Sequence, residues 1–318
     1  MNTEQEFIPI KPLETAVLFV VFNRLDTTKQ VFEAIQKAEP PRLYIAADGA
    51  NENKQGEAEK VQAVRDYIMQ NIDWECEVST LFRDRNLGCK YAPAGAISWF
   101  FENEEQGIIL EDDCLPSQSF FWYCEELLIK YKTNESVYLI SGDGRGPEST
   151  QMKEDYGFCK YPIIWGWASW SRVWKKYDPE ILDWPLHRDS LPKLISQNKA
   201  TERFWSQVLE KMYKNEVNAW DYQFSYLLFK NKGKCIVPRL NQITNIGFGA
   251  DATHTFDMNS SAANRARYNF KLPLKHEVNM ASEMKINEFY DRSEFSMPDF
   301  FSRVINKIAR IFIKRNIV

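Results

Sequence analysis

The order of apolar and helical segments predicts an α/β fold, in which a mainly parallel sheet is flanked by helices. Over the first 145 residues, short apolar runs alternate with stretches of helical periodicity. Connections of this kind return each strand in the same direction through a right-handed crossover. Beyond residue 258 the chain turns polar and irregular before a final amphipathic stretch, which predicts a C-terminal helical extension. The 318 residues are enough for one large domain or two small ones.

Each expected strand is a short apolar run, and each expected helix carries apolar residues three or four positions apart. The first strand is apolar throughout and should be buried on both faces, and the helix after it stops at Pro40-Pro41. The expected strands are residues 16–22, 42–47, 75–82, 107–110, 136–140 and 234–238. The expected helices are residues 27–38, 61–68, 91–101, 120–131, 204–212 and 220–228.

Three acids, Glu111-Asp112-Asp113, follow the fourth expected strand directly. Carboxylates released together repel one another and stay ionised only beside positive charge. Hard oxygen ligands suit Mg²⁺ or Mn²⁺, and a cation held by one or two carboxylates keeps positions for a substrate diphosphate. Ligands of open α/β sheets bind outside the carboxyl ends of the strands, where these acids are expected. The alternative is a solvated acidic turn in which Glu111 or Asp112 caps the next helix.

The charged turn at residues 83–90 follows the third expected strand and precedes a helix expected to begin at about Tyr91. Its three cations and the helix N-terminus favour an anion such as phosphate. The alternative is a solvated charged turn.

Three features of the second half could serve a ligand. Trp165-Gly166-Trp167 is either an aromatic wall of a binding site or part of the core. Asp221 lies among aromatic residues, where burial would raise its pKa and suit it to proton transfer; otherwise it is a helix cap or a structural acid. His254, one of three histidines, is either a metal ligand or a surface residue.

Composition and charge exclude some function classes. A net charge of −4 argues against nucleic acid as a partner, because such binding needs a basic face. No secretory signal opens the chain and the six cysteines have no metal-binding spacing, so we expect reduced thiols and a cytoplasmic location. Residues 297–315 form an amphipathic stretch with a basic face. It predicts either peripheral association with the inner membrane surface or a helix docked on its own domain.

Several short motifs together resemble a known family. They are Val20 to Arg24, Ala47 to Gly49, Arg85 to Gly88, Leu110 to Asp113, Trp165 to Trp167, Trp220-Asp221 and Asn245 to Thr255. From about Pro12 to Thr255 the chain resembles nucleotide-diphospho-sugar transferases of the GT-A fold, a Rossmann-like fold. In particular it resembles the bacterial family 2-like glycosyltransferases of surface-polysaccharide biosynthesis. The resemblance implies a donor half at residues 12–145, an acceptor and catalytic half of the same domain at 146–258, and an extension at 259–318.

The resemblance also implies residue roles. The implied donor site comprises Phe22, Asn23, Arg24, Asp48, Asn86, Gly88, Lys90, Glu111 and Asp112. The implied metal ligands are Asp113, Asp112 and His254, the implied sugar and acceptor contacts are Trp165, Gly166 and Trp167, and the implied catalytic base is Asp221. The family usually has an acidic pair at the base position, whereas here Tyr222 follows Asp221.

The expected function is a metal-dependent glycosyl transfer that uses Mn²⁺ or Mg²⁺. The donor is a nucleotide-diphospho-sugar, by resemblance a UDP-sugar, and the acceptor is a hydroxyl of a glycan or a lipid-linked saccharide. Two alternatives remain. A sugar-nucleotide nucleotidyltransferase should carry a glycine-rich phosphate loop after the first strand, but residues 22–26 contain no glycine. A catalytically inactive scaffold would bind a nucleotide or carbohydrate without turnover.

Overall fold

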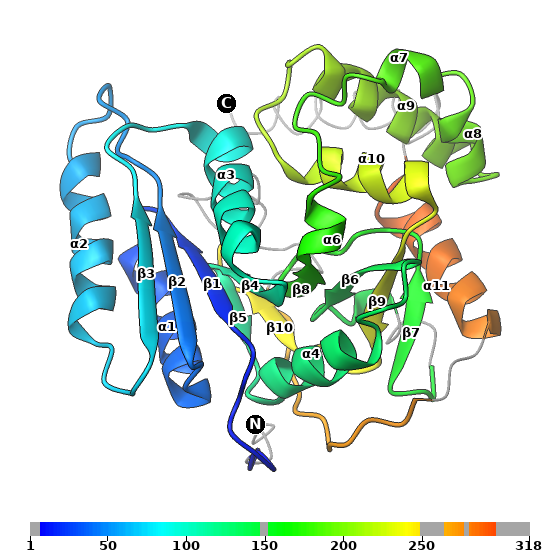
Figure 1. Ribbon diagram of the computed structural model, residues 1–318. Coiled ribbons are helices and arrows are strands. Elements are labelled where there is room, and N and C mark those ends of the chain that lie inside the picture. Colours follow the sequence, from blue (N-terminus) through cyan, green and yellow to red (C-terminus); the bar gives the residue numbers. More distant parts are fainter. Residues whose placement is uncertain (1–6, 147–151, 249–263, 277–279, 297–318) are drawn as a thin grey trace, which may run out of the picture.

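The computed structural model describes residues 7–146, 152–248, 264–276 and 280–296. Eight strands form one sheet in the order β3-β2-β1-β4-β8-β6-β9-β7, and β5 pairs with β10 in a second, two-stranded sheet (Figure 1). The strands of the large sheet are β1 (Val17–Val21), β2 (Arg42–Ala47), β3 (Glu77–Phe82), β4 (Gln106–Glu111), β6 (Val137–Ser141), β7 (Tyr156–Cys159), β8 (Trp167–Trp170) and β9 (Lys234–Pro238). The small sheet consists of β5 (Cys114–Pro116) and β10 (Ile243–Asn245).

The sheet confirms the expected fold class. Neighbouring strands run parallel in the pairs β1–β2, β2–β3, β1–β4 and β6–β9. Strand β8 lies antiparallel between β4 and β6, and β7 lies antiparallel to β9. Six strands therefore point one way and two point the other way. Strands β7, β8 and β9 join the same sheet as β1 to β4 and β6, so both halves of the chain share one core.

Several long helices lie beside the sheet, and three short helices and one of 15 residues join β8 to α10 (Figure 1). The order β1, β2, β3 and then back to β4 places α1 and α2 on one face and α3 on the other, because parallel crossovers are right-handed. The described helices are α1 (Leu25–Ala38), α2 (Glu57–Gln70), α3 (Gly88–Asn103), α4 (Ser119–Lys130), α6 (Ser171–Trp174), α7 (Trp184–His187), α8 (Leu191–Ile195), α9 (Lys199–Tyr213), α10 (Asp221–Asn231) and α11 (Met280–Ser293).

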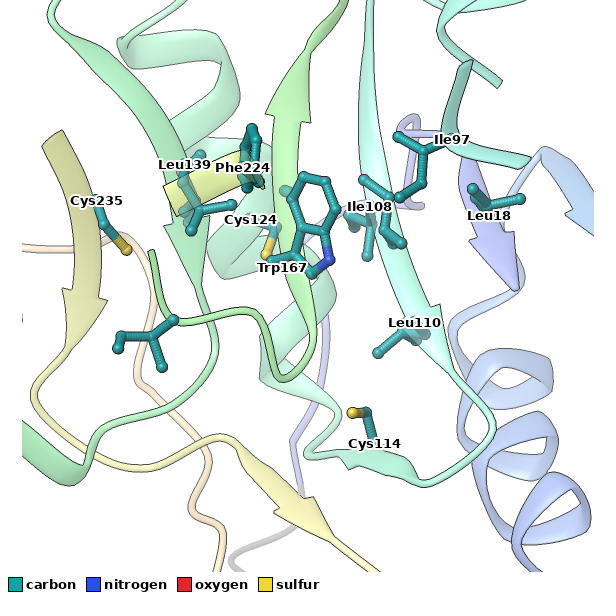
Figure 2. Packing of buried hydrophobic residues seen from close by; sticks show 14 of the residues in the cluster. Leu18, Ile97, Ile108, Leu110, Cys114, Cys124, Leu139, Trp167, Phe224 and Cys235 are labelled. Atoms are coloured by element: carbon teal, nitrogen blue, oxygen red, sulfur yellow. The ribbon is translucent and has the colours of Figure 1, made fainter. Parts of the chain in front are cut away.

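The core follows from the apolar strands. Every residue of β1 except Val20 is buried, as expected for a strand covered on both faces. Trp167 lies near the middle of the sheet with Ile108, Leu139 and Phe224 around it (Figure 2). Such close packing of large rings makes the middle of the sheet a rigid support for the loops at its edge.

Helix α3 begins three residues earlier than its apolar periodicity predicts, at Gly88 rather than at about Tyr91. The reason is a cap from a distant strand: the Asp48 carboxylate accepts hydrogen bonds from the backbone N–H groups of Leu87 and Gly88 at 3.0 Å. Gly88 has φ +76°, a conformation that favours glycine.

Two expected features lie outside the described residues, His254 and the amphipathic stretch at 297–315. Among the helices that the structure does describe, none is both long and apolar enough to cross a membrane.

Candidate active site

The candidate site lies where the strand order reverses. Strand β1 has β2 on one side and β4 on the other, so the helices that follow β1 and β4 leave in different directions. In open α/β sheets, ligands usually bind in a crevice outside the carboxyl ends of the strands at such a point, and this position is called the crevice below. Glu111, the last residue of β4, pairs with Val20 of β1, and Arg24 stands just before α1. The acidic motif and Arg24 therefore lie at this crevice.

Arg24 holds the two aspartates of the motif together. Its Nη2 lies 2.8 Å from Asp113 Oδ2 and also pairs with Asp112, whose Oδ2 accepts from Arg24 Nε at 3.4 Å. The backbone N–H of Phe22 donates to the Asp112 carboxylate as well. Both aspartates are buried, whereas Arg24 remains partly exposed. Part of the implied donor site, Phe22 and Arg24, thus meets the implied metal ligands directly.

One guanidinium does not balance three neighbouring carboxylates. Burial, together with Asp113 and Asp112, raises the pKa of Glu111 to about 8. Burial also raises the pKa of Asp112 to about 6, although Arg24 acts in the opposite direction. Carboxylates with raised pKa values are stabilised in their ionised form by additional positive charge. The crevice therefore favours the binding of a cation.

The donor set fits a divalent cation that also binds a ligand diphosphate. Asp112 and Asp113 converge on a single nitrogen of Arg24, so their oxygens can share one positive centre. In the part of the chain that the structure describes, no group of three His, Cys, Asp or Glu side chains could hold a metal ion by itself. Mg²⁺ and Mn²⁺ commonly use one or two carboxylates together with phosphate oxygens and water, which suits this pair.

Asp221 comes from the second half of the chain and lies within electrostatic range of Glu111. It is the first residue of α10 and is half-buried. Its charge contributes to the raised pKa of Glu111, and it also raises the pKa of Tyr177, where burial is the larger cause. Although 110 positions separate them in the sequence, Glu111 and the expected base are therefore close enough for their charges to interact.

The backbone at Gly247 packs against the acidic motif. A Cβ at Gly247 would lie 2.2 Å from Asp113 Oδ2 and 2.8 Å from Arg24 Nη1. The N–H of Ile246 donates to the carbonyl oxygen of Asp113 at 2.9 Å, and Asn245 pairs with Cys114 in the small sheet. Only a glycine fits against the aspartate at this position.

The structure separates the two tryptophans of the Trp-Gly-Trp motif. Trp165 is half-buried; its ring lies 5.9 Å from that of Phe248 in an edge-on contact, and the Arg145 guanidinium lies over it at 4.4 Å. Trp167 is fully buried and stacks on Trp220. The prediction that Trp167 borders the sugar is therefore wrong, because its position in β8 directs the ring into the core. Trp165 remains available to a ligand.

Gly166 is required by packing. It has φ +57°, and a Cβ there would lie 2.4 Å from Ile243 Cδ1. The residue is buried and allows β8 to pack against the small sheet. Since glycine has no side chain, only its backbone could contact a sugar.

The remaining donor-side residues support the loops around the crevice. The Asp48 carboxylate accepts from Gly49 N–H as well as from the start of α3. Asn86 donates to the Gly49 carbonyl oxygen at 2.8 Å, and Asn23 donates to Glu57 Oε1 at 3.0 Å. These contacts position the loops at the ends of β1, β2 and β3, and direct contacts of these residues with a nucleotide stay predictions.

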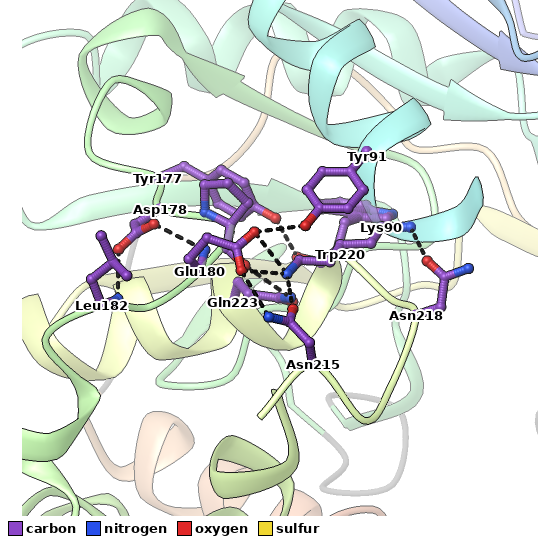
Figure 3. A network of polar contacts seen from close by, with 11 residues as sticks. Lys90, Tyr91, Tyr177, Asp178, Glu180, Leu182, Asn215, Asn218, Trp220 and Gln223 are labelled. Carbon is purple, nitrogen blue, oxygen red and sulfur yellow. Dashed lines mark hydrogen bonds and ion pairs between the residues drawn. The ribbon is translucent and has the colours of Figure 1, made fainter. Parts of the chain in front are cut away.

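Lys90 is turned toward the second half of the chain. Its Nζ lies 2.9 and 3.0 Å from the two carboxylate oxygens of Glu180 and also pairs with Asn215 (Figure 3). Its side chain is 4% exposed. The thiol of the preceding residue, Cys89, is half-buried, and burial together with the charges of Glu111 and Asp48 raises its pKa, so it lies within electrostatic range of both carboxylates. The sequence analysis did not predict Cys89 as a site residue. It lies at the start of a helix between a glycine and a lysine, where no periodic pattern marks it.

Comparisons with known proteins show a partial structural likeness. No family model matches the chain, and no curated protein matches it in sequence. A mannosyltransferase from Pyrobaculum calidifontis, solved in complex with GDP-Man and Mn²⁺, is 9% identical, with a TM-score of 0.37 over 70% of this chain and 72% of its own. Mouse xyloside xylosyltransferase 1 is 9% identical, with a TM-score of 0.35 over 69% of this chain and 82% of its own. A UDP-glucose pyrophosphorylase is 10% identical, with a TM-score of 0.35 over 72% of this chain and 93% of its own. The overlap is partial, and the function proposed below rests on the residues of this chain.

Proposed function

We propose that the protein is a glycosyltransferase that moves a sugar from a nucleotide-diphospho-sugar to a hydroxyl group of an acceptor. The observation that carries the proposal is that Arg24 pairs with Asp112 and Asp113 beside Glu111, and that the charge of Asp221 acts on Glu111 from the second half of the chain. The first four offer charges that suit a diphosphate and its cation. Asp221 offers a carboxylate on a different element, as a displacement reaction requires, because the attacking and leaving groups lie on opposite sides of the reacting carbon.

In this mechanism Asp221 accepts the proton of the acceptor hydroxyl while the hydroxyl oxygen attacks the anomeric carbon. The bond from that carbon to the diphosphate oxygen breaks, and configuration inverts. Arg24 orients Asp112 and Asp113 and supplies positive charge close to the diphosphate. Mn²⁺ or Mg²⁺, held by Asp112 and Asp113, would act as a Lewis acid toward the leaving diphosphate. Trp165 presents a partly open ring on which the apolar face of a sugar can pack.

The finer assignments belong to the same proposal. By the family resemblance alone, the donor is a UDP-sugar and the acceptor is a glycan or lipid-linked saccharide, in surface-polysaccharide biosynthesis. Such a reaction uses cytoplasmic nucleotide sugars and an acceptor at the membrane surface.

The test begins with the donor. Calorimetric titration with UDP, GDP, dTDP and CMP, each with and without Mn²⁺, should show metal-dependent binding of one nucleotide. Its nucleotide sugar should then be hydrolysed slowly in the absence of an acceptor. Asp113→Ala should remove the metal-dependent part of binding. Asp221→Asn should keep binding and lower turnover by about 10²–10⁴-fold, the usual contribution of a general base. Glu102→Gln, an exposed acid at the far end of α3, is the control and should match the wild type.

Other outcomes assign the crevice differently. Release of pyrophosphate from a nucleoside triphosphate and a sugar phosphate would show a nucleotidyltransferase. Nucleotide binding without any turnover, unchanged by Asp221→Asn, would show a binding protein. Full transfer activity in both Asp113→Ala and Asp221→Asn would refute the proposed residue roles.

A further inference from the structure

Lys90 is the only buried lysine of the described residues, and its charge is already satisfied by groups from the second half of the chain. A lysine ammonium has three N–H donors. The two carboxylate oxygens of Glu180 and the side-chain oxygen of Asn215 are three acceptors within hydrogen-bonding distance. Tyr91 and the Asn215 amide donate to the same carboxylate, at 2.8 and 3.1 Å. Lys90 therefore has no donor left for a phosphate.

The contacts of Lys90 continue toward Asp221. The backbone N–H of Lys90 donates to Asn218 Oδ1 at 2.8 Å, and a Cβ at Gly88 would lie 2.8 Å from Asn218 Nδ2. The hydroxyl of Tyr177 donates to the carbonyl oxygen of Trp220 at 3.0 Å. The stretch between α9 and α10 is thus held at Asn215, at Asn218 and at Trp220, immediately before Asp221 (Figure 3).

The other end of this network is anchored at the donor side of the crevice. The first turn of α3, which carries Lys90, is bound to Asp48 at the end of β2, because two backbone N–H groups donate to the Asp48 carboxylate. The thiol of Cys89, in the same turn, lies within electrostatic range of Asp48 and Glu111. One turn of helix therefore joins the donor side of the crevice to the segment that presents Asp221.

We propose that Lys90 and Glu180 are positioning residues: their ion pair, in which the lysine is buried and the glutamate partly exposed, holds residues 215–220 on the first turn of α3 and so holds Asp221 in its working position. The inference rests on the proposed function, in which Asp221 acts as the base. Displacement of a reacting group by about 1 Å can cost about 10²-fold in rate, so a loosened segment should lower turnover without weakening nucleotide binding.

The experiment uses Lys90→Met, Glu180→Gln and the double variant in the full chain. The conservative Glu180→Gln keeps the test open if Lys90→Met fails to fold. Both single variants should lower kcat by about 10–100-fold. They should leave the Kd of the nucleoside diphosphate, measured with Mn²⁺, within about twofold of the wild type, and the double variant should be no slower than the worse single variant. Lys132→Met breaks an exposed pair with Glu105 and is the control, with no expected change in kcat.

Two results would overturn the inference. If Lys90→Met weakens nucleotide binding tenfold or more while Glu180→Gln does not, Lys90 binds the diphosphate. If both variants keep the wild-type kcat, the pair serves stability alone.

A second readout separates this inference from the proposed function. Hydrogen–deuterium exchange at residues 214–222 should be faster in Glu180→Gln than in the wild type, whether or not a donor sugar has been found. Unchanged exchange there refutes the positioning role of the Lys90–Glu180 pair. Faster exchange in a protein that transfers no sugar supports that role and refutes only the glycosyltransferase proposal.

Discussion

Gly166→Ala should destabilise the protein through two separable effects. The backbone at Gly166 has φ +57°, and an alanine in this left-handed region costs about 1–2 kcal/mol. The new Cβ would also lie 2.4 Å from Ile243 Cδ1 and 2.7 Å from Ile243 Cγ1, inside a packed core. Overpacking of this kind costs about 1–3 kcal/mol. The expected loss of unfolding free energy is the sum, about 2–5 kcal/mol.

Gly56→Ala is the matched control for the backbone part. Gly56 has φ +77°, but a Cβ there meets nothing within 4 Å, so only the conformational cost of about 1–2 kcal/mol applies. The difference between the two variants measures the packing at Gly166. In urea unfolding, Gly166→Ala should lose about 1–3 kcal/mol more than Gly56→Ala. In thermal unfolding this extra loss corresponds to a further fall in Tm of about 1.5–4.5 °C, at about 1.5 °C per kcal/mol for a chain of 318 residues.

A double-mutant cycle identifies the contact responsible. Ile243→Ala removes the atoms that the new Cβ would meet, so it should cost less in the Gly166→Ala background than in the wild type. The expected coupling is about 1–3 kcal/mol. The reasoning is refuted if Gly166→Ala is no more destabilising than Gly56→Ala, or if the losses from Gly166→Ala and Ile243→Ala simply add.

Three further predictions follow from named contacts. Asp48→Ala should lower the unfolding free energy by about 1–2 kcal/mol, because the start of α3 loses its cap, and urea unfolding that matches the wild type would contradict this. The hydrogen bond from Lys90 holds the pKa of Glu180 below its ordinary value, so the stability from this ionised carboxylate is present above about pH 4.5 and is lost as pH falls through the lowered pKa. Between pH 5 and 3 the Tm of the wild type should therefore fall more steeply than that of Glu180→Gln; equal slopes would contradict the pairing. In a Cys76→Ser background, alkylation of Cys89 by iodoacetamide, followed by mass spectrometry, should slow when a tightly binding nucleoside diphosphate occupies the crevice, and an unchanged rate would place the nucleotide elsewhere.

The local features of the fold could be read from the sequence because they depend on periodicity. The apolar runs at residues 16–22 and 42–47 predicted β1 and β2, and both are buried in the sheet. The acids after residue 110 were expected at the end of a strand, and Glu111 does end β4. When an apolar strand is buried in a sheet, the charged residues that follow it lie at the edge of that sheet, so their position follows from the sequence.

Long-range pairing could not be read in the same way. The insertion of β8 between β4 and β6 in the opposite direction depends on contacts between segments about 60 residues apart, for example Ile108 with Ala168. The same pairing decides which tryptophan enters the core. Trp165 and Trp167 are chemically identical and two residues apart, yet only the register of β8 determines that Trp167 is buried while Trp165 stays partly open.

The sequence by itself determined that this chain forms an α/β sheet with an acidic motif at a strand end, because burial and charge are properties of neighbouring residues. Only the tertiary structure decided which charges meet. Lys90 was expected to face a phosphate from its place in a cationic turn, but Glu180, 90 positions away, lies beside it. Arg24 and Asp112, 88 positions apart, form the pair at the centre of the crevice. The sequence does not show which charged residues become neighbours, because that depends on how distant segments fold together. The partner then determines the direction of a charged side chain such as that of Lys90 at the start of α3.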